Sequence, residues 1–258
     1  MAVFIQFAPE ISAHDFWIEP STFRAASSEL IFVRLKVGQD FDGASLRRNP
    51  TAIQSFRTTF DDGVSEIQGN PGDEPAGFVL LPSPGLHVLS YQSHPTKLMM
   101  NAERFQAYLQ EAGLDSVIRI RRERGQSETL GRERFIRCAK AMVLAGKENS
   151  DGFDRILGLT LELIPETNPH TIQPGHIMSL RLLHDKQPQG DALVFARNMN
   201  TPDQPVSART DEEGRVRFCL PEHGQWLISC IQMVQVDNDN LVDWESRWAS
   251  LTFQIDSP

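Results

Sequence analysis

Hydrophobic and polar residues alternate over short stretches in the first third of the chain. In residues 28–37 this alternation predicts a strand that turns Leu30 and Phe32 inward. Residues 77–81 and 86–92 are two further apolar runs, each bounded by proline or glycine. Short runs between turn residues are typical of strands in an antiparallel sheet.

A helical period follows these strands. Asn101 is a residue type that caps helix N-termini, and Phe105, Tyr108 and Leu109 fall on one face of the helix that it would begin. Gly113 is a typical end for that helix.

Asp115 has the residue type of a second cap, and the helix it predicts ends near Gly125. The next apolar stretch, residues 134–144, fits either a helix or a strand. Residues 158–164 predict a strand, and residues 165–169 resemble a linker.

Beyond residue 174 the pattern is entirely that of strands separated by turns. The predicted strands are residues 178–183, 192–196, 215–220, 225–233 and 248–255. Such spacing is typical of a small antiparallel sandwich. We therefore expect a mainly β protein with two β-sandwich domains. The predicted parts are a leader remnant (1–13), a β domain with a helical insertion (14–165) and an immunoglobulin- or transthyretin-like sandwich (174–257).

The charge of the chain argues against nucleic-acid binding. The formal net charge is −9, whereas nucleic-acid-binding domains are usually basic. Seven arginines between Arg119 and Arg137 form a local exception, which is either a solvated surface or a docking patch for an acidic partner. No apolar stretch of about 20 residues predicts a membrane span.

The first 13 residues resemble the end of a secretory signal. They are apolar, carry no charge before Glu10, and end in Ile11-Ser12-Ala13. Cleavage after Ala13 would expose His14 as the first residue, in a protein located in the periplasm. A strand at the start of an intracellular protein is the alternative interpretation.

An N-terminal histidine suits a transition metal. Its α-amine has a pKa of about 8 and its imidazole a pKa of about 6.5, so both nitrogens are readily available to one divalent ion. Asp15 adds a carboxylate, and His87, near the start of a predicted strand, is a candidate third ligand. Ni²⁺, Co²⁺, Cu²⁺ and Zn²⁺ all fit such donors.

The remaining chemistry-bearing residues give weaker signals. The phosphate-loop, dinucleotide, nucleophile-elbow and zinc-protease motifs are absent from the sequence, so no catalytic residue is predicted. Cys219 and Cys230 fall on successive predicted strands but about three positions out of register, and we expect all three cysteines to be mostly buried thiols.

Several segments together resemble a bacterial family of exported domains of unknown function that is grouped with periplasmic components of nickel and cobalt import systems. The leading segment is Ala13-His-Asp-Phe-Trp-Ile-Glu-Pro20. The others are Gly85-Leu-His-Val-Leu-Ser-Tyr91, Phe105-Gln-Ala-Tyr-Leu-Gln-Glu-Ala-Gly-Leu114, Arg134-Phe-Ile-Arg-Cys-Ala-Lys-Ala141 and Asp243-Trp-Glu-Ser-Arg-Trp-Ala-Ser-Leu-Thr-Phe253.

This resemblance implies a periplasmic β-sandwich protein that handles transition metals and has no established catalytic activity. It also implies that His14 is the residue that follows the signal peptide. Gln232 stands where related sequences are expected to have histidine.

These observations lead to three functional hypotheses. The first is a periplasmic metal-binding accessory protein that serves a membrane importer of nickel or cobalt. The second is a non-catalytic, extracytoplasmic ligand- or protein-binding module that uses the arginine patch, in which charge reversal at Arg121 and Arg122 would abolish binding. The third is a copper enzyme with an N-terminal histidine brace, which requires a second histidine at the copper.

Overall fold

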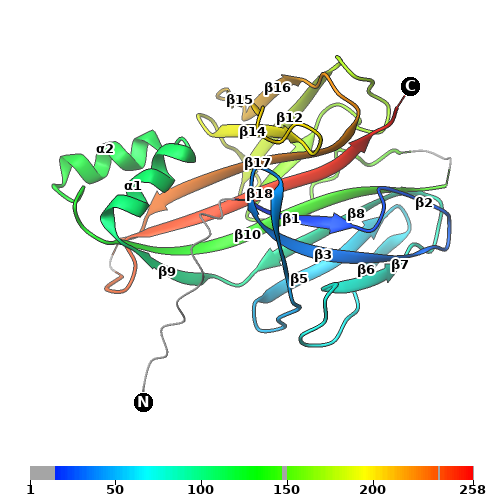
Figure 1. Cartoon of the computed structure of the whole chain (residues 1–258), viewed down its shortest axis with the longest axis horizontal. Coiled ribbons are helices and arrows are strands. Elements are labelled where there is room, and N and C mark those ends of the chain that lie inside the picture. Colours follow the sequence, from blue (N-terminus) through cyan, green and yellow to red (C-terminus); the bar gives the residue numbers. More distant parts are fainter. Residues whose placement is uncertain (1–14, 147–149, 238, 258) are drawn as a thin grey trace.

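The computed structural model describes residues 15–146, 150–237 and 239–257, which form three β-sheets and two helices (Figure 1). The first outer sheet consists of β1 (Asp15–Pro20), β3 (Leu30–Gln39), β4 (Asp42–Leu46) and β7 (Gly77–Leu80). The second outer sheet consists of β11 (Leu161–Pro165), β12 (Ile177–His184), β13 (Gln187–Pro188) and β16 (Arg215–Cys219).

The central sheet has ten strands. Its order is β15 (Val206–Arg209), β14 (Leu193–Asn198), β17 (Gly224–Gln235), β18 (Trp244–Ile255), β10 (Gly131–Ala145), β8 (Gly85–Ser93), β5 (Ile53–Phe60) and β6 (Gly63–Glu66). Two short strands, β2 (Arg24–Ala25) and β9 (Thr96–Met100), also pair with β10. The helices are α1 (Ala102–Glu111) and α2 (Asp115–Glu123).

Strand β10 is buried on both faces. Ala141 and Val143 belong to the core under the first outer sheet, whereas Met142 and Leu144 belong to the core under the second. Successive side chains of a strand point to opposite faces, so a strand covered on both sides has a nearly continuous apolar sequence. Residues 134–144 therefore fitted both a helix and a strand, and the structure shows a strand.

Each outer sheet forms a sandwich with the central sheet. Ile31 and Val33 of β3 lie in the first core, and Leu180 and Leu182 of β12 lie in the second. Most strand pairs around the second core are antiparallel, as in immunoglobulin-like sandwiches, and the pair of β10 with β18 is parallel. The prediction of a mainly β fold with two sandwich cores and a helical insertion is confirmed.

The two predicted domains share the central sheet. Strand β10 pairs in parallel with β18, from Glu133 opposite Trp244 to Ala141 opposite Thr252. β10 comes from the predicted segment 14–165 and β18 from the predicted segment 174–257. Their division into independent folding units stays a prediction.

The predicted orientation of β3 is wrong. Ile31 and Val33 are fully buried, while Leu30 and Phe32 are each 47% exposed on the outer face. Because four consecutive residues of this strand are apolar, alternation alone does not identify the buried face. Burial against the central sheet selects Ile31 and Val33.

The helical insertion covers one end of the central sheet (Figure 1). The Asn101 side chain accepts a hydrogen bond from the backbone N–H of Arg104 at 2.8 Å, which confirms the predicted cap of α1. Phe105 of α1 is fully buried against β10, and a Cβ atom on Gly131 would lie 2.2 Å from its Cγ. Gly131 therefore permits the close approach of α1 to the sheet.

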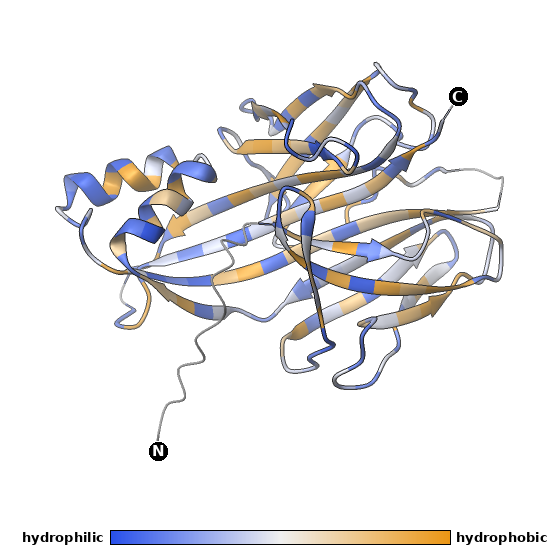
Figure 2. Ribbon diagram, in the orientation of Figure 1, coloured by the Kyte–Doolittle hydropathy of each residue, from blue (hydrophilic) through white to orange (hydrophobic). Residues whose placement is uncertain are grey.

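Most of the residues of helix α2 are coloured as hydrophilic in the ribbon of Figure 2. Asp115 is its first residue and makes no side-chain cap, contrary to the prediction. The carboxylate of Asp115 instead pairs with Arg209 at 2.6 Å. In the described part of the chain, no helix is long and apolar enough to cross a membrane.

Candidate functional site

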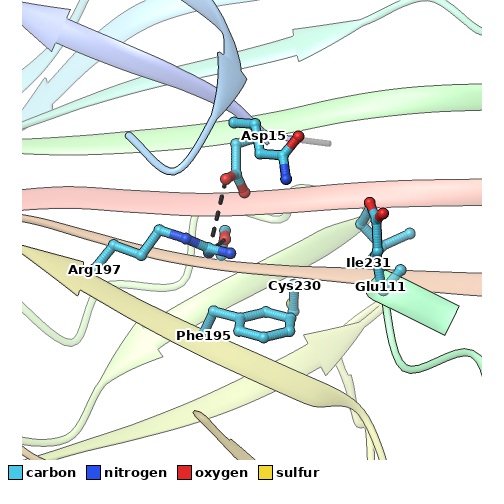
Figure 3. Close-up of a pocket in the computed structure, with 9 residues that line it drawn as sticks. Asp15, Glu111, Phe195, Arg197, Cys230 and Ile231 are labelled. Carbon is cyan, nitrogen blue, oxygen red and sulfur yellow. Dashed lines mark hydrogen bonds and ion pairs between the residues drawn. The ribbon is translucent and has the colours of Figure 1, made fainter. Parts of the chain in front are cut away.

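The start of β1 lies at a pocket between the first outer sheet, β14, β17 and the end of α1 (Figure 3). Its lining residues are Asp15, Gln39, Glu111, Ala112, Phe195, Arg197, Ser229, Cys230 and Ile231. The pocket is small, with a cavity volume of about 50 Å³, and it is open to solvent. It joins residues that are more than 200 positions apart in the chain.

Arg197 holds Asp15 in place. Its guanidinium lies 3.7 Å from the Asp15 carboxylate and 3.4 Å from that of Asp40, and it also donates to the Ser229 hydroxyl at 3.4 Å. The Phe195 ring lies beneath the guanidinium, with 4.7 Å between the Arg197 Cζ and the ring centre. Only 6% of the Asp15 side chain is exposed. The first described residue of the chain is therefore anchored at the pocket.

The thiol at the pocket stays protonated. Burial raises the pKa of Cys230 well above its ordinary value. Cys138, Cys219 and Cys230 are all free, and Cys219 is exposed on the second outer sheet, contrary to the expectation that it is mostly buried. Because protonated thiols are poor metal ligands, Cys230 supplies no preformed ligand to the pocket.

His87 lies in the interior of the central sheet. It is fully buried, its Nε2 is 2.8 Å from the carbonyl oxygen of Ser83, and its ring centre lies 5.1 Å from that of Phe60. Burial is the main cause that lowers the pKa of this imidazole. These contacts are those of a core histidine.

The structure does not bring His87 to Asp15. Cys230 at the pocket pairs with Ala249, which in turn pairs with Cys138 of β10. His87 pairs instead with Val143 of β10. Val143 is five residues beyond Cys138, which is about 16 Å along a strand.

The other described side chains form no metal site either. His14 lies outside the described residues. Burial lowers the pKa of His170 to about 4, and burial also lowers that of His184. Within residues 15–146, 150–237 and 239–257, no three side chains of His, Cys, Asp or Glu form a group that could hold a metal ion.

The arginine-rich segment is mostly structural. Arg121 is only 1% exposed, lies over the Phe105 ring and donates to the carbonyl of Thr129 at 2.9 Å. Arg132 pairs with Asp243, and Arg134 pairs with Glu245. The predicted role of Arg121 in a docking patch is therefore wrong, because its side chain is committed to the core. The exposed members of the segment are Arg119, Arg122 and Arg124.

Replacing Arg121 with glutamine is expected to lower the free energy of unfolding by about 1–2 kcal/mol, through loss of its contacts with Phe105 and Thr129. The matched change Arg122→Gln, at the adjacent exposed position, is expected to have little measurable effect. Urea unfolding followed by circular dichroism measures both. Equal effects of the two changes would contradict the assignment of Arg121 to the core.

Sequence reasoning identified Asp15 but missed the residues that surround it. Phe195 lies within the predicted strand 192–196 and Arg197 directly follows it, yet nothing local indicates that this strand lies near the start of β1. Glu111 ends α1, where it resembles any exposed helix residue. Their proximity is a consequence of sheet topology, which no motif encodes.

Two solved structures have a remote likeness to this chain. The D0-D1 domain of intimin is 11% identical with a TM-score of 0.23, and the match covers 93% of this chain and 98% of that one. A tetra-tandem repeat in the extending region of a large adhesion protein is 9% identical with a TM-score of 0.22, covering 95% and 50%. Such superpositions support no inference about function.

Comparison by sequence is more informative at the family level. No curated protein matches the chain. Residues 11–233 match the model of a family described as a domain of unknown function, DUF4198. This match spans β1, the helical insertion and most of β17, and the chain therefore belongs to the DUF4198 family.

Proposed function

We propose that the protein is a periplasmic accessory protein that binds a divalent transition metal through His14 after cleavage behind Ala13. The observation that carries the proposal is the anchoring of Asp15 by Arg197 at the pocket. Peptide linkage then keeps an N-terminal His14 next to the pocket. Service to a membrane importer of nickel or cobalt is part of the same proposal and is supported by the family resemblance.

The donors at this end of the chain suit such an ion. His14 would contribute its α-amine and imidazole nitrogens, which are borderline donors that bind Ni²⁺, Co²⁺, Cu²⁺ and Zn²⁺. The Asp15 and Glu111 carboxylates line the pocket beside it. Since His87 is buried elsewhere, it has no place in this ligand set, and His14 must supply the main chelate.

Metal titration by calorimetry tests the proposal. Protein that begins at His14 is expected to bind Ni²⁺ tightly, and His14→Ala in the same protein is expected to abolish binding. The control His87→Gln is expected to leave the affinity unchanged, because His87 lies about 16 Å along the sheet from the pocket. A fall in affinity with His87→Gln equal to that with His14→Ala would contradict the proposed ligand set.

Stability measurements show whether the pocket contributes ligands. A chelate made by His14 alone would bind the folded and unfolded chains equally and leave the unfolding free energy unchanged. A site completed by Asp15 or Glu111 binds the folded chain preferentially and adds about 2.7 kcal/mol at a metal concentration 100 times Kd. We expect the second result.

An exposed apolar surface favours the second candidate function, a protein-binding module. Leu30 lies opposite Leu80, and Phe32 lies opposite Phe78, on the outer face of β3 and β7. Their exposed fractions are 47%, 53%, 47% and 38%, in that order. Partner binding that survives His14→Ala but is lost in the double variant Phe32→Ser, Leu80→Ser would favour this function over metal binding.

The third candidate, a copper histidine brace, requires a second histidine at the same ion. Among the described residues that line the pocket there is no histidine. The arrangement that we propose therefore has His14 as its only histidine, with a carboxylate of Asp15 or Glu111 completing the site.

A further inference from the structure

Strand β9 lies at an open edge of the central sheet, below α1 in Figure 1. One side of β9 pairs with β10 in antiparallel orientation, from Thr96 opposite Phe135 to Met100 opposite Gly131. In the described part of the chain, no strand pairs with the other side of β9, and no backbone group outside β10 bonds to it. Successive residues of a strand direct their N–H and C=O groups to opposite sides, so about half of these groups point away from β10. They are available to another strand.

The neighbouring strand β5 ends before it reaches β9. β5 pairs with β8, and its last pair on this side is Ile53 opposite Ser93. The chain before Ile53 leaves the sheet in a turn over residues 49–52, where the N–H of Ala52 donates to the carbonyl of Asn49. Among the described residues, none forms a strand in the position that continues the line of β5 beside β9. The outer edge of β9 is therefore open along the sheet.

The exposed side chains of β9 are mostly apolar. Leu98 is 39% exposed and Met99 is 63% exposed. The outermost strands at the two ends of the sheet order, β6 and β15, each carry one exposed large apolar side chain, Val64 and Val206. Edge strands usually carry charges or prolines that prevent pairing with another chain. Lys97 is the only charged residue of β9, and its charge acts on Asp239 of the same chain.

The sequence of β9 is complementary to itself. In an antiparallel pair centred on Leu98, this residue lies opposite Leu98 of a second copy, Thr96 lies opposite Met100, and Lys97 lies opposite Met99. No like charges are directly opposite each other in this register, and the aliphatic stem of each lysine lies against a methionine. Pairing over the five residues forms about four to six backbone hydrogen bonds.

We infer that β9 is a self-association surface, at which two copies of the chain pair in antiparallel orientation about Leu98 and join their central sheets. Such a contact has two-fold symmetry, and the same edge serves both copies. A second copy is the occupant that we infer, because the register about Leu98 matches apolar residues and opposes no charges. The edge has only five residues, and small interfaces are typical of reversible association, so we expect a dimer that dissociates on dilution. The surface goes beyond the proposed metal function and does not depend on it, since it uses neither His14 nor the pocket at Asp15.

Sedimentation velocity of the full chain, with EDTA present, tests the inference over a concentration range of about 1 to 300 µM. We expect monomer at the lowest concentration and dimer at the highest. Leu98→Lys is expected to weaken dimerisation at least about 10-fold, because it places two positive charges opposite each other at the two-fold axis. The control Val206→Lys, on the edge strand β15, is expected to leave dimerisation unchanged.

A mixture of two variants distinguishes lost pairing at β9 from a defect in folding. Leu98→Glu alone is expected to be monomeric for the same reason as Leu98→Lys. When the two variants are mixed, opposite charges face each other at the axis, and a dimer with one copy of each is expected to form. Three results would each overturn the inference: an unaltered protein that is monomeric at every concentration, a dimer that Leu98→Lys leaves unchanged, or a mixture that stays monomeric.

Discussion

Replacing Lys140 with methionine is expected to lower the free energy of unfolding by about 3–5 kcal/mol, the cost of leaving a buried charge without its partner. Lys140 and Glu162 are 2% and 1% exposed, and 3.0 Å separates Nζ from Oε1. Lys140 also donates to the carbonyl of Leu163 at 3.0 Å. Methionine fills most of the same volume. It carries no charge to balance the Glu162 carboxylate, and it has no hydrogen to donate to the Leu163 carbonyl.

Other hydrogen bonds hold the Glu162 carboxylate in the interior, so it cannot rotate into solvent when Lys140 is replaced. Its carboxylate also accepts hydrogen bonds from the backbone N–H groups of Leu157 at 2.8 Å, Gly158 at 2.8 Å and Leu159 at 3.2 Å. The pair therefore fixes the segment before β11 to β10. Urea unfolding followed by circular dichroism measures the loss, and Lys97→Met on the exposed strand β9 is the matched control. A loss below about 1 kcal/mol, the range for exposed pairs, would contradict a buried pair.

Glu133→Gln is expected to remove a pH dependence of stability. The Glu133 Oε1 accepts hydrogen bonds from the hydroxyls of Ser246 and Tyr108, the latter at 3.2 Å, while Trp248 donates to Ser246 at 3.0 Å. Burial raises the pKa of Glu133 from 4.5 to about 7, although these hydrogen bonds oppose the rise. Because burial outweighs these hydrogen bonds, the folded protein is more stable when the Glu133 carboxyl is protonated.

The sign of the effect follows from the direction of this shift. A raised pKa means that the folded state holds the proton more tightly than the unfolded state. The stabilisation is complete below about pH 4.5 and is lost as the pH rises to about 7. Between pH 5 and pH 8 the loss from this group is about 2–3 kcal/mol.

Denaturant unfolding at pH 5 and pH 8 measures this difference. The side chain of Glu133→Gln is neutral at both pH values. From pH 5 to pH 8, the free energy of unfolding of this variant is therefore expected to fall by about 2–3 kcal/mol less than that of the unaltered protein. Glu103→Gln, at an exposed glutamate of α1, is expected to retain the full dependence. An unchanged fall in Glu133→Gln would mean that Glu133 is ionised in the folded protein at pH 5.

The sequence predicted the local structure of the helical insertion well. Asn101 and the spacing of Phe105, Tyr108 and Leu109 define α1 because a cap and a helical period are both local signals. The burial of Arg121 could also be predicted from the helical period, since Arg121 lies four residues after the buried Val117 on the same face of α2. Because arginine is charged, the sequence-based prediction placed Arg121 on the protein surface.

Long-range pairing could not be predicted in this way. Nothing in the sequence of β10 or β18 indicates that they pair in parallel, because each is an apolar strand with several equivalent neighbours. The same limit applies to the candidate site, where Asp15 meets Arg197 only through the order of the sheets. His87 looked like a ligand because histidine is a frequent one, and only its burial identifies it as a core residue.

Calorimetric titration of Ni²⁺ into two proteins that differ by one residue tests the central claim most directly. One begins at His14, and the other begins at Ala13, which places an amide where the α-amine would be and so destroys the amine–imidazole chelate. We expect tight binding of one ion by the protein that begins at His14 and a large loss of affinity in the other. Equal affinity of the two proteins would contradict a metal site at the N-terminal histidine.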